Sequence, residues 1–319
     1  MPGEAAALRR LDNVIWALVA GVAAMVLFAA AASRFQIVFG SYTAAAGAGI
    51  LLLGAAYYYR TRRAELKLAS ALESTAQVLI FAAVAAPLSY VAASVAMPLQ
   101  DAAFDAMDRA LGFNWNEMLA FMNRWPGFFL FLRAIYLSLT LQMTAVVLLL
   151  AFTGRLAWLR VYMLAFIFTA LLTIALSALV PAEGAWLHFG LKAGQSVMPS
   201  SHTSWPVFHG LRDGSYRLVM AAGSEGIITF PSLHAALAVI LMAAFWPVPI
   251  ARWVSAVVNS LMLAATPIDG SHYLVDVLAG VAIAFMCLLA ARRFVSRTIA
   301  IPMTARSFAP DGIRVASSR

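Results

Sequence analysis

Cysteine, charged residues and cofactor-binding motifs are scarce or missing in this sequence. The single cysteine, Cys287, has no second cysteine to pair with, so an intrachain disulfide is excluded. Only 11% of the residues are charged and 63% are hydrophobic, whereas soluble domains contain about 45–50% apolar residues. The sequence contains no glycine-rich nucleotide loop and no HExxH zinc motif. A soluble domain is therefore excluded, and no cofactor is expected.

Long apolar runs fill the sequence instead, and the mean hydropathy is +0.86. Eight of them are long enough, or nearly so, to cross a bilayer as helices. They are Val14–Ala32, Thr43–Tyr59, Thr75–Ala96, Phe128–Phe152, Trp158–Val180, Pro231–Trp246, Ala251–Thr266 and His272–Ala291. The sequence thus predicts an all-α polytopic membrane helix bundle with about eight transmembrane helices.

This pattern divides the chain into three predicted parts. Residues 1–70 hold two N-terminal helices and a basic cytoplasmic loop, residues 71–297 form a six-helix core, and residues 298–319 form a loose cytoplasmic tail. The first run also resembles a cleavable signal peptide, but its length favours an uncleaved anchor.

The net charge of +8 comes from basic residues that lie between the apolar runs. They form no stripe with interleaved aromatics, so a nucleic-acid partner is not expected. With the N-terminus inside, most of them, Arg160 included, fall on the cytoplasmic side, as the positive-inside rule requires. This orientation predicts an inner (plasma) membrane protein.

Two short polar strings each open an apolar run and carry a histidine. The first is Phe230-Pro231-Ser232-Leu233-His234. Proline suits the first turn of a helix, where its missing N–H is not needed. Ser232 and the free N–H groups of that turn form a site that favours an anion such as phosphate.

The second string runs from Gly270 to Asp276 and contains His272. His272 and Asp276 are four residues apart, so on a helix the carboxylate can orient and activate the imidazole. Between His234 and His272 the chain crosses the bilayer as one helix and returns as a second. This predicts that both histidines lie on the same, exoplasmic side of the bilayer.

The two strings resemble signature motifs of the type 2 phosphatidic acid phosphatase superfamily, in the variant of inositol phosphorylceramide synthases and their bacterial relatives. The resemblance implies that His272, held by Asp276, attacks a lipid phosphate and that His234 protonates the leaving group. The usual arginine six residues before the nucleophile is Thr266 here, and the usual Arg-Pro after Lys192 is Pro199-Ser200.

Several residues have more than one interpretation. Pro199-Ser200-Ser201-His202 has the same form as the first string, but Pro206 soon follows and should prevent a long helix, which favours His234. Each catalytic histidine taken alone fits a hydrogen-bonded histidine within a bundle. Cations that could bind phosphate are Arg212, Arg217 and Lys192, although lipid headgroup contacts or salt bridges would also explain them.

Two segments between the runs are also informative. Asp101, Asp105 and Asp108 have helical spacing within Leu99–Pro126, which predicts an amphipathic surface helix. The three acids favour a solvated helix face over a divalent cation site. The polar segment Pro181–Thr229 is the expected lid or substrate loop.

The sequence predicts a membrane lipid-phosphate phosphatase or phosphotransferase that acts through a phosphohistidine on the exoplasmic face, with a phosphorylated lipid as its partner. Transfer of a phosphoryl headgroup to a lipid or to inositol is the alternative within this class. A bis-histidine haem membrane protein is the alternative outside it, although it gives Ser232 and Asp276 no role. An idle scaffold or transporter would not require His234, His272 and Asp276 together. The lipid and the oligomeric state are not determined by the sequence.

Overall fold

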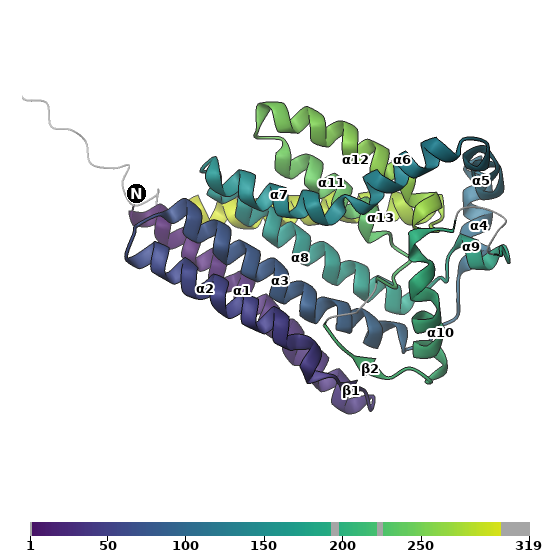
Figure 1. Ribbon diagram of the computed structural model, residues 1–319, viewed down its shortest axis with the longest axis horizontal. Helices are drawn as coiled ribbons and strands as arrows, with labels where there is room; N and C mark the ends of the chain where they lie inside the picture. Colours follow the sequence, from purple (N-terminus) through teal and green to yellow (C-terminus); the bar gives the residue numbers. More distant parts are fainter. Residues whose placement is uncertain (1, 193–197, 222–225, 301–319) are drawn as a thin grey trace, which may run out of the picture.

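The structure is a computed structural model that describes residues 2–192, 198–221 and 226–300. Long helices lie side by side along one axis of the molecule (Figure 1). They are α1 (Pro2–Ala32), α2 (Thr43–Thr61), α3 (Leu66–Ala93), α6 (Pro126–Leu137), α7 (Leu139–Phe152), α8 (Leu156–Leu179), α11 (Leu233–Phe245), α12 (Pro249–Asp269) and α13 (Leu274–Ala300). The predicted all-α polytopic bundle is confirmed.

The exception to all-α structure in the described chain is one parallel pair of two-residue strands. Strand β1 (Gln36–Ile37) pairs with β2 (Leu218–Val219), with Gln36 opposite Leu218. A short 3₁₀ helix, η1 (Phe39–Tyr42), follows β1. Residues 301–319 of the predicted tail lie outside the described residues, and α13 continues to Ala300, beyond the predicted limit of the core at residue 297.

All eight predicted runs are helical, but not all of them meet a strict length and hydropathy test for a membrane span. Within the described chain five helices meet it, and the bent pair of α6 and α7 makes a sixth. Helix α11 is apolar but has only 13 residues, which at about 1.5 Å per residue is shorter than a hydrocarbon core of about 30 Å. The clear spans are therefore fewer than the eight expected, and α12 is not among them.

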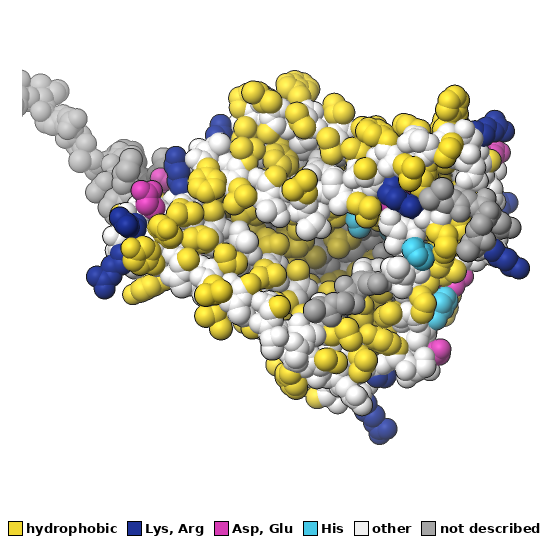
Figure 2. All heavy atoms as spheres, viewed as in Figure 1, with side chains coloured by type: hydrophobic (Ala, Val, Ile, Leu, Met, Phe, Trp, Pro, Cys, Tyr) yellow, Lys and Arg dark blue, Asp and Glu magenta, His cyan; other side chains and the backbone are white. Residues whose placement is uncertain are grey.

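The outer faces of the bundle are apolar. Figure 2 shows hydrophobic side chains over the middle of the molecule, with lysine and arginine side chains mainly at its left and right ends and a further one at its lower tip. Large apolar side chains project outward from several helices, and Phe28, Leu51 and Ile250 are 75%, 75% and 83% exposed. Extensive apolar surface of this kind fits contact with lipid chains.

Helix α8 is at the centre of the bundle and packs against α3, α11 and α13. It carries a buried ion pair to the first helix: Arg160 Nε and Nη2 donate to the Asp12 carboxylate at 2.9 and 2.8 Å. Arg160, expected among the basic residues of the cytoplasmic side, is therefore buried in an ion pair rather than exposed. A buried charge must be paired, and Asp12 fixes α1 to the core in this way.

The fourth predicted run is broken at Ser138 into α6 and α7, which differ in direction by 44°. Ser138 Oγ donates to the Ile135 carbonyl at 2.6 Å, a local bond that competes with the helical ladder. The bend allows α6 to pack against α12. Helix α6 also carries Tyr136, which lines the cavity of the candidate site.

Four short helices gather at the end of the bundle opposite the N-terminus (Figure 1). They are α4 (Asp101–Ala110), α5 (Trp115–Arg124), α9 (Ala185–His188) and α10 (Trp205–Asp213). The amphipathic helix expected within Leu99–Pro126 is thus two helices, and the Asn114 side chain caps the second by accepting from the Asn116 and Glu117 N–H groups.

Candidate active site

The two histidine strings meet where α11 and α13 begin. Ser232 is the N-cap of α11, so Pro231 precedes the helix and does not lie in its first turn as predicted. The Ser232 Oγ accepts from the Ala235 N–H at 3.3 Å. The Ser232 N–H donates to the Asp276 carbonyl at 3.1 Å. A Cβ on Gly280 would lie 2.3 Å from the Ser232 carbonyl oxygen, so this close approach of α13 to α11 requires glycine.

His272 lies in the short loop before α13 and is buried, between two polar partners. Its Nδ1 lies 3.3 Å from Asp276 Oδ2, and its Nε2 lies 3.3 Å from Ser232 Oγ. The Tyr273 N–H donates to the same Asp276 oxygen at 2.9 Å and holds the carboxylate in place. The predicted pairing of His272 with Asp276 is therefore present, with Ser232 on the other ring nitrogen.

Burial lowers the pKa of His272 to about 4, while a hydrogen bond with the Thr229 backbone works in the opposite direction. A lowered histidine pKa means that the ring is neutral at any pH well above that value. The imidazole therefore has a lone pair available at neutral pH. This is the protonation state that a nucleophilic histidine requires.

His234, in the first turn of α11, contacts a tyrosine from a distant part of the chain. The ring of Tyr136, on α6, stacks on the His234 ring with centroids 4.0 Å apart and planes 11° apart. The Tyr136 hydroxyl lies 3.2 Å from His234 Nδ1. No pattern in the sequence indicates Tyr136, because nothing local relates it to a histidine 98 positions away.

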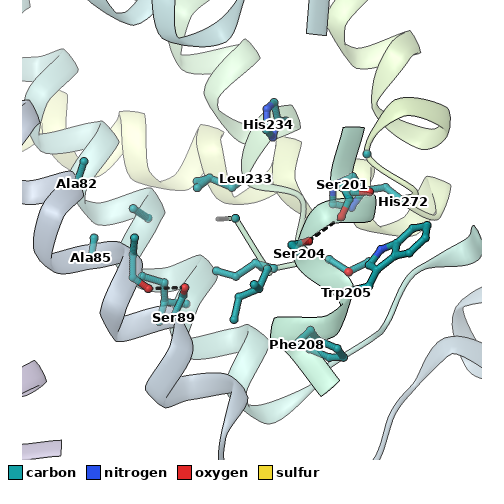
Figure 3. A pocket seen from close by; sticks show the side chains of 18 of the residues that line it. Ala82, Ala85, Ser89, Ser201, Ser204, Trp205, Phe208, Leu233, His234 and His272 are labelled. Carbon is teal, nitrogen blue, oxygen red and sulfur yellow. Dashed lines mark hydrogen bonds between the residues drawn. The ribbon is translucent and has the colours of Figure 1, made fainter. Parts of the chain in front are cut away.

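A cavity of about 270 Å³ brings both histidines together. Figure 3 shows Ala82, Ala85 and Ser89 of α3 on one side of it and Ser201, Trp205 and His272 on the other. Residues of α8 and of 226–229 complete the wall, which is mostly apolar. The space-filling view shows a hollow with hydrophobic side chains around it and histidine side chains on one side (Figure 2).

The predicted phosphate-binding cations do not line this cavity. Arg212 Nη2 donates to the Met97 carbonyl at 2.8 Å, and Arg217 Nη1 donates to the Leu211 carbonyl at 2.6 Å. Lys192 is exposed. The described residues of the cavity wall include no lysine or arginine. Polar groups that do reach the cavity are hydroxyls, the two histidines and Glu183.

The predicted loop Pro181–Thr229 supplies one wall of the cavity, and its residues 193–197 and 222–225 lie outside the described residues. The His202 string forms a 3₁₀ turn, η2 (Ser200–Ser204), and Pro206 sits in the first turn of α10 rather than ending helical structure. His202 is exposed and does not line the cavity, whereas Ser201 and Ser204 do. The geometry thus favours His234 over His202.

An ion pair behind this wall was not predicted from the sequence. Arg133, one turn before Tyr136 on α6, donates from Nε to Asp269 Oδ1 at 2.7 Å and from Nη2 to the Met198 carbonyl. Ser200 Oγ donates to Asp269 Oδ2 at 2.6 Å. The pair joins three parts of the wall: α6, the end of α12 and the η2 turn. In the sequence, the only indication that Asp269 has a role is its position three residues before His272.

Two of the three aspartates on α4 hold the loops around the site rather than facing solvent. Asp108 accepts from the Leu274 and Val275 N–H groups at 2.7 and 2.9 Å, at the start of α13. Asp101 accepts from the Gly184 N–H and the Tyr273 hydroxyl, both at 3.0 Å. Both side chains are buried, so the predicted solvated face is wrong for them. Among the described residues no group of three or more His, Cys, Asp or Glu could hold a metal.

Comparison with known proteins identifies the family. A family model described as "PAP2 superfamily" matches residues 102–290, which is more than half of the chain and includes both histidine strings. No curated protein and no solved structure matches the chain. Members of this superfamily are generally phosphatases or phosphotransferases. The chain belongs to the PAP2 superfamily.

Proposed function

We propose that this protein is a membrane lipid-phosphate phosphatase or phosphotransferase that works through a phosphohistidine intermediate. The observation that carries the proposal is the His272–Asp276 pair, which shares one mostly apolar cavity with His234. Membership of the superfamily supports the general reaction class. The lipid substrate and the covalent step are inferred from the geometry.

In the proposed mechanism His272 Nε2 attacks phosphorus while Asp276 holds Nδ1 and stabilises the imidazolium that forms. The bond from phosphorus to the leaving oxygen breaks, and a proton from His234 passes to that oxygen. Water then attacks the phosphohistidine, gives a proton back to His234 and releases phosphate. An alcohol in place of water makes the same site a transferase.

The phosphoryl oxygens would be held mainly by neutral donors. Ser232 Oγ lies 3.3 Å from the nucleophilic nitrogen, and α11 begins at the same place with its free N–H groups. Arg133 adds positive charge behind the cavity wall, but it is paired with Asp269. Donors that are fixed before the reaction stabilise developing charge without reorganising. This arrangement would replace the arginines that the usual motifs provide.

A lipid tail accounts for the rest of the cavity. Small side chains of α3, Ala82, Ala85 and Ala86, line it together with Phe166 and Ala170 of α8. Burial of an alkyl chain against such a wall contributes about 0.8 kcal/mol per CH₂ group. A soluble phosphate ester would leave this apolar surface unused, so the wall favours a lipid.

We also propose that the site faces the exoplasmic side of the inner membrane. The short helices around the site lie at the opposite end of the bundle from the N-terminus (Figure 1), and the distribution of basic residues favours a cytoplasmic N-terminus. No ATP is available on that side, and the substrate would be a phosphorylated lipid of the outer leaflet.

Cysteine labelling tests this orientation in a Cys287→Ser background. Thr203→Cys, on the exposed part of the η2 turn, is expected to react with a membrane-impermeant thiol reagent in intact spheroplasts. Thr61→Cys, exposed at the end of α2, is expected to react only after permeabilisation. The reverse pattern would place the chemistry in the cytoplasm.

One observation favours transfer to an alcohol over hydrolysis. Glu183 lines the cavity, and its carboxylate lies 3.7 Å from the exposed His209 Nε2. A carboxylate beside a phosphate anion is repulsive, but it accepts hydrogen bonds well from a polyol such as inositol. Glu183 would then bind the acceptor and not the phosphate.

A lipid-phosphate panel, assayed with and without inositol, tests both functions. The wild-type protein is expected to release phosphate or to form a new phosphodiester from at least one lipid phosphate. If Glu183 binds the acceptor, Glu183→Gln should lower transfer by about tenfold, the value of one charged hydrogen bond of about 1.5 kcal/mol, and leave hydrolysis nearly unchanged. Absence of both activities across the panel would contradict the proposed function.

A further inference from the structure

The two catalytic histidines of the proposed mechanism have different partners. His272 faces a carboxylate, Asp276, whereas His234 faces a phenol, Tyr136. Among the described residues, Tyr136 is the only hydrogen-bond partner of the His234 ring. The difference needs a chemical explanation, because one kind of partner would serve if both histidines only had to be held in place.

A carboxylate suits a nucleophile, because it only accepts hydrogen bonds and stabilises the positive ring. A proton donor has another requirement, since His234 must alternate between a charged and a neutral ring. A neutral hydroxyl can accept from the Nδ1–H in both states, because loss of the Nε2 proton leaves the Nδ1–H in place, and it lacks the negative charge that would hold the ring in its charged form. The Tyr136 hydroxyl can therefore hold His234 in both states without retaining the proton.

The stacking of the Tyr136 ring on the His234 ring also helps to hold His234 in place. The two rings are nearly parallel with centroids 4.0 Å apart, and the face of an aromatic ring attracts a cation. Tyr136 thus fixes the plane of the His234 ring and can stabilise it when charged. The Tyr136 hydroxyl and the His272 ring also both lie next to Gly270: a Cβ there would be 2.9 Å from Tyr136 Oη and 2.4 Å from His272 Cδ2.

Helix α6 holds Tyr136 firmly in this position. Tyr136 is buried, and Arg133, one turn earlier, is tied to Asp269 at the end of α12. On α5, which packs against both helices, the Trp115 Nε1–H donates to the Pro267 carbonyl of α12 at 3.0 Å. The tyrosine is thus fixed relative to both histidine strings by contacts that do not involve His234.

We propose that Tyr136 is a positioning residue for proton transfer by His234 to the leaving oxygen, an inference that rests on the proposed function. The hydroxyl and the ring together aim His234 Nε2 at that oxygen. As the bond from phosphorus to the oxygen breaks, the Nε2 proton moves to the oxygen, and the neutral ring keeps its bond to the Tyr136 hydroxyl. Water that later attacks the phosphohistidine returns a proton to Nε2.

The test compares two leaving groups in wild type and Tyr136→Phe, which keeps the ring and removes the hydroxyl. An alkyl phosphate needs protonation of its leaving oxygen, whereas a nitrophenyl phosphate does not. General acid catalysis contributes about 10²–10⁴-fold, so partial misplacement of His234 should lower kcat on the alkyl phosphate by roughly 10- to 100-fold. On the nitrophenyl phosphate the rate of the nitrophenol burst, which reports phosphorylation of His272 and not the later hydrolysis, should change less than about twofold.

Tyr162→Phe is the matched control, because Tyr162 is also buried and its hydroxyl has no partner among the described residues. It should leave both rates unchanged. An equal loss on both substrates in Tyr136→Phe would show a merely structural role, and no loss on either would show that the hydroxyl is not used. Both results overturn the inference. Wild-type turnover that depends on His272 would still support the proposed function in either case.

Discussion

His272→Ala is expected to abolish turnover of every lipid phosphate that the wild-type protein accepts, by roughly 10⁴-fold or more. The imidazole Nε2 would be the atom that bonds to phosphorus, and no other described nucleophile takes its place between Asp276 and Ser232. The variant should remain folded in detergent, because a smaller side chain is tolerated beside an open cavity. Phosphate release after reconstitution measures the loss.

His202→Ala is the matched control for this prediction. His202 belongs to the similar Pro-Ser-Ser-His string, but its side chain is exposed and does not line the cavity. It should retain wild-type activity. Normal turnover in His272→Ala, or loss in His202→Ala alone, would transfer the nucleophile to another residue and overturn the mechanism.

The covalent phosphohistidine intermediate can be trapped with variants of the same two catalytic histidines. In His234→Ala the nitrophenyl leaving group can depart without protonation, whereas hydrolysis of the intermediate lacks its base. An acid-labile phosphoenzyme should therefore accumulate in His234→Ala and be absent from the double variant that also lacks His272.

Gly270→Ala is expected to lower kcat by about 100-fold, because a displacement of about 1 Å at a reacting group can cost this much. The new methyl carbon would lie 2.4 Å from His272 Cδ2, 2.8 Å from the Thr266 carbonyl oxygen and 2.9 Å from the Tyr136 hydroxyl. The Thr266 carbonyl belongs to the backbone of α12, so the histidine and the tyrosine must move instead. Both belong to the proposed catalytic geometry.

Gly127→Ala on α6 is the control, since a Cβ there meets nothing within 4 Å. It should keep full activity. The thermal unfolding of both variants should be compared, because a folded Gly270→Ala protein with lost activity supports displacement of the histidine. Unchanged kinetics in Gly270→Ala would show that the close packing between His272 and Tyr136 is not needed.

The order of the helices and the membrane class were predictable because they depend on local properties. Apolar runs of sufficient length form helices whatever their neighbours are. The break at Ser138 was not predicted, because hydropathy continues through it and a single serine does not usually end a helix. The burial of Arg160 was not predicted for a similar reason: a charge count cannot show that Asp12 pairs with it inside the bundle.

The residues of the candidate site also divide into contacts that the sequence predicts and contacts that it does not. The sequence by itself determined that His272 pairs with Asp276, although His272 lies just before the helix and not on it, and that a helix begins beside Ser232, because neighbours four residues apart and a helix start depend on the local backbone. Only the tertiary structure decided that Tyr136 meets His234, that Arg133 reaches Asp269, and that Asp108 caps α13. These partners are 98, 136 and 166 positions apart. Contacts over such separations follow from how helices pack, and packing depends on the shapes of whole surfaces rather than on any local pattern.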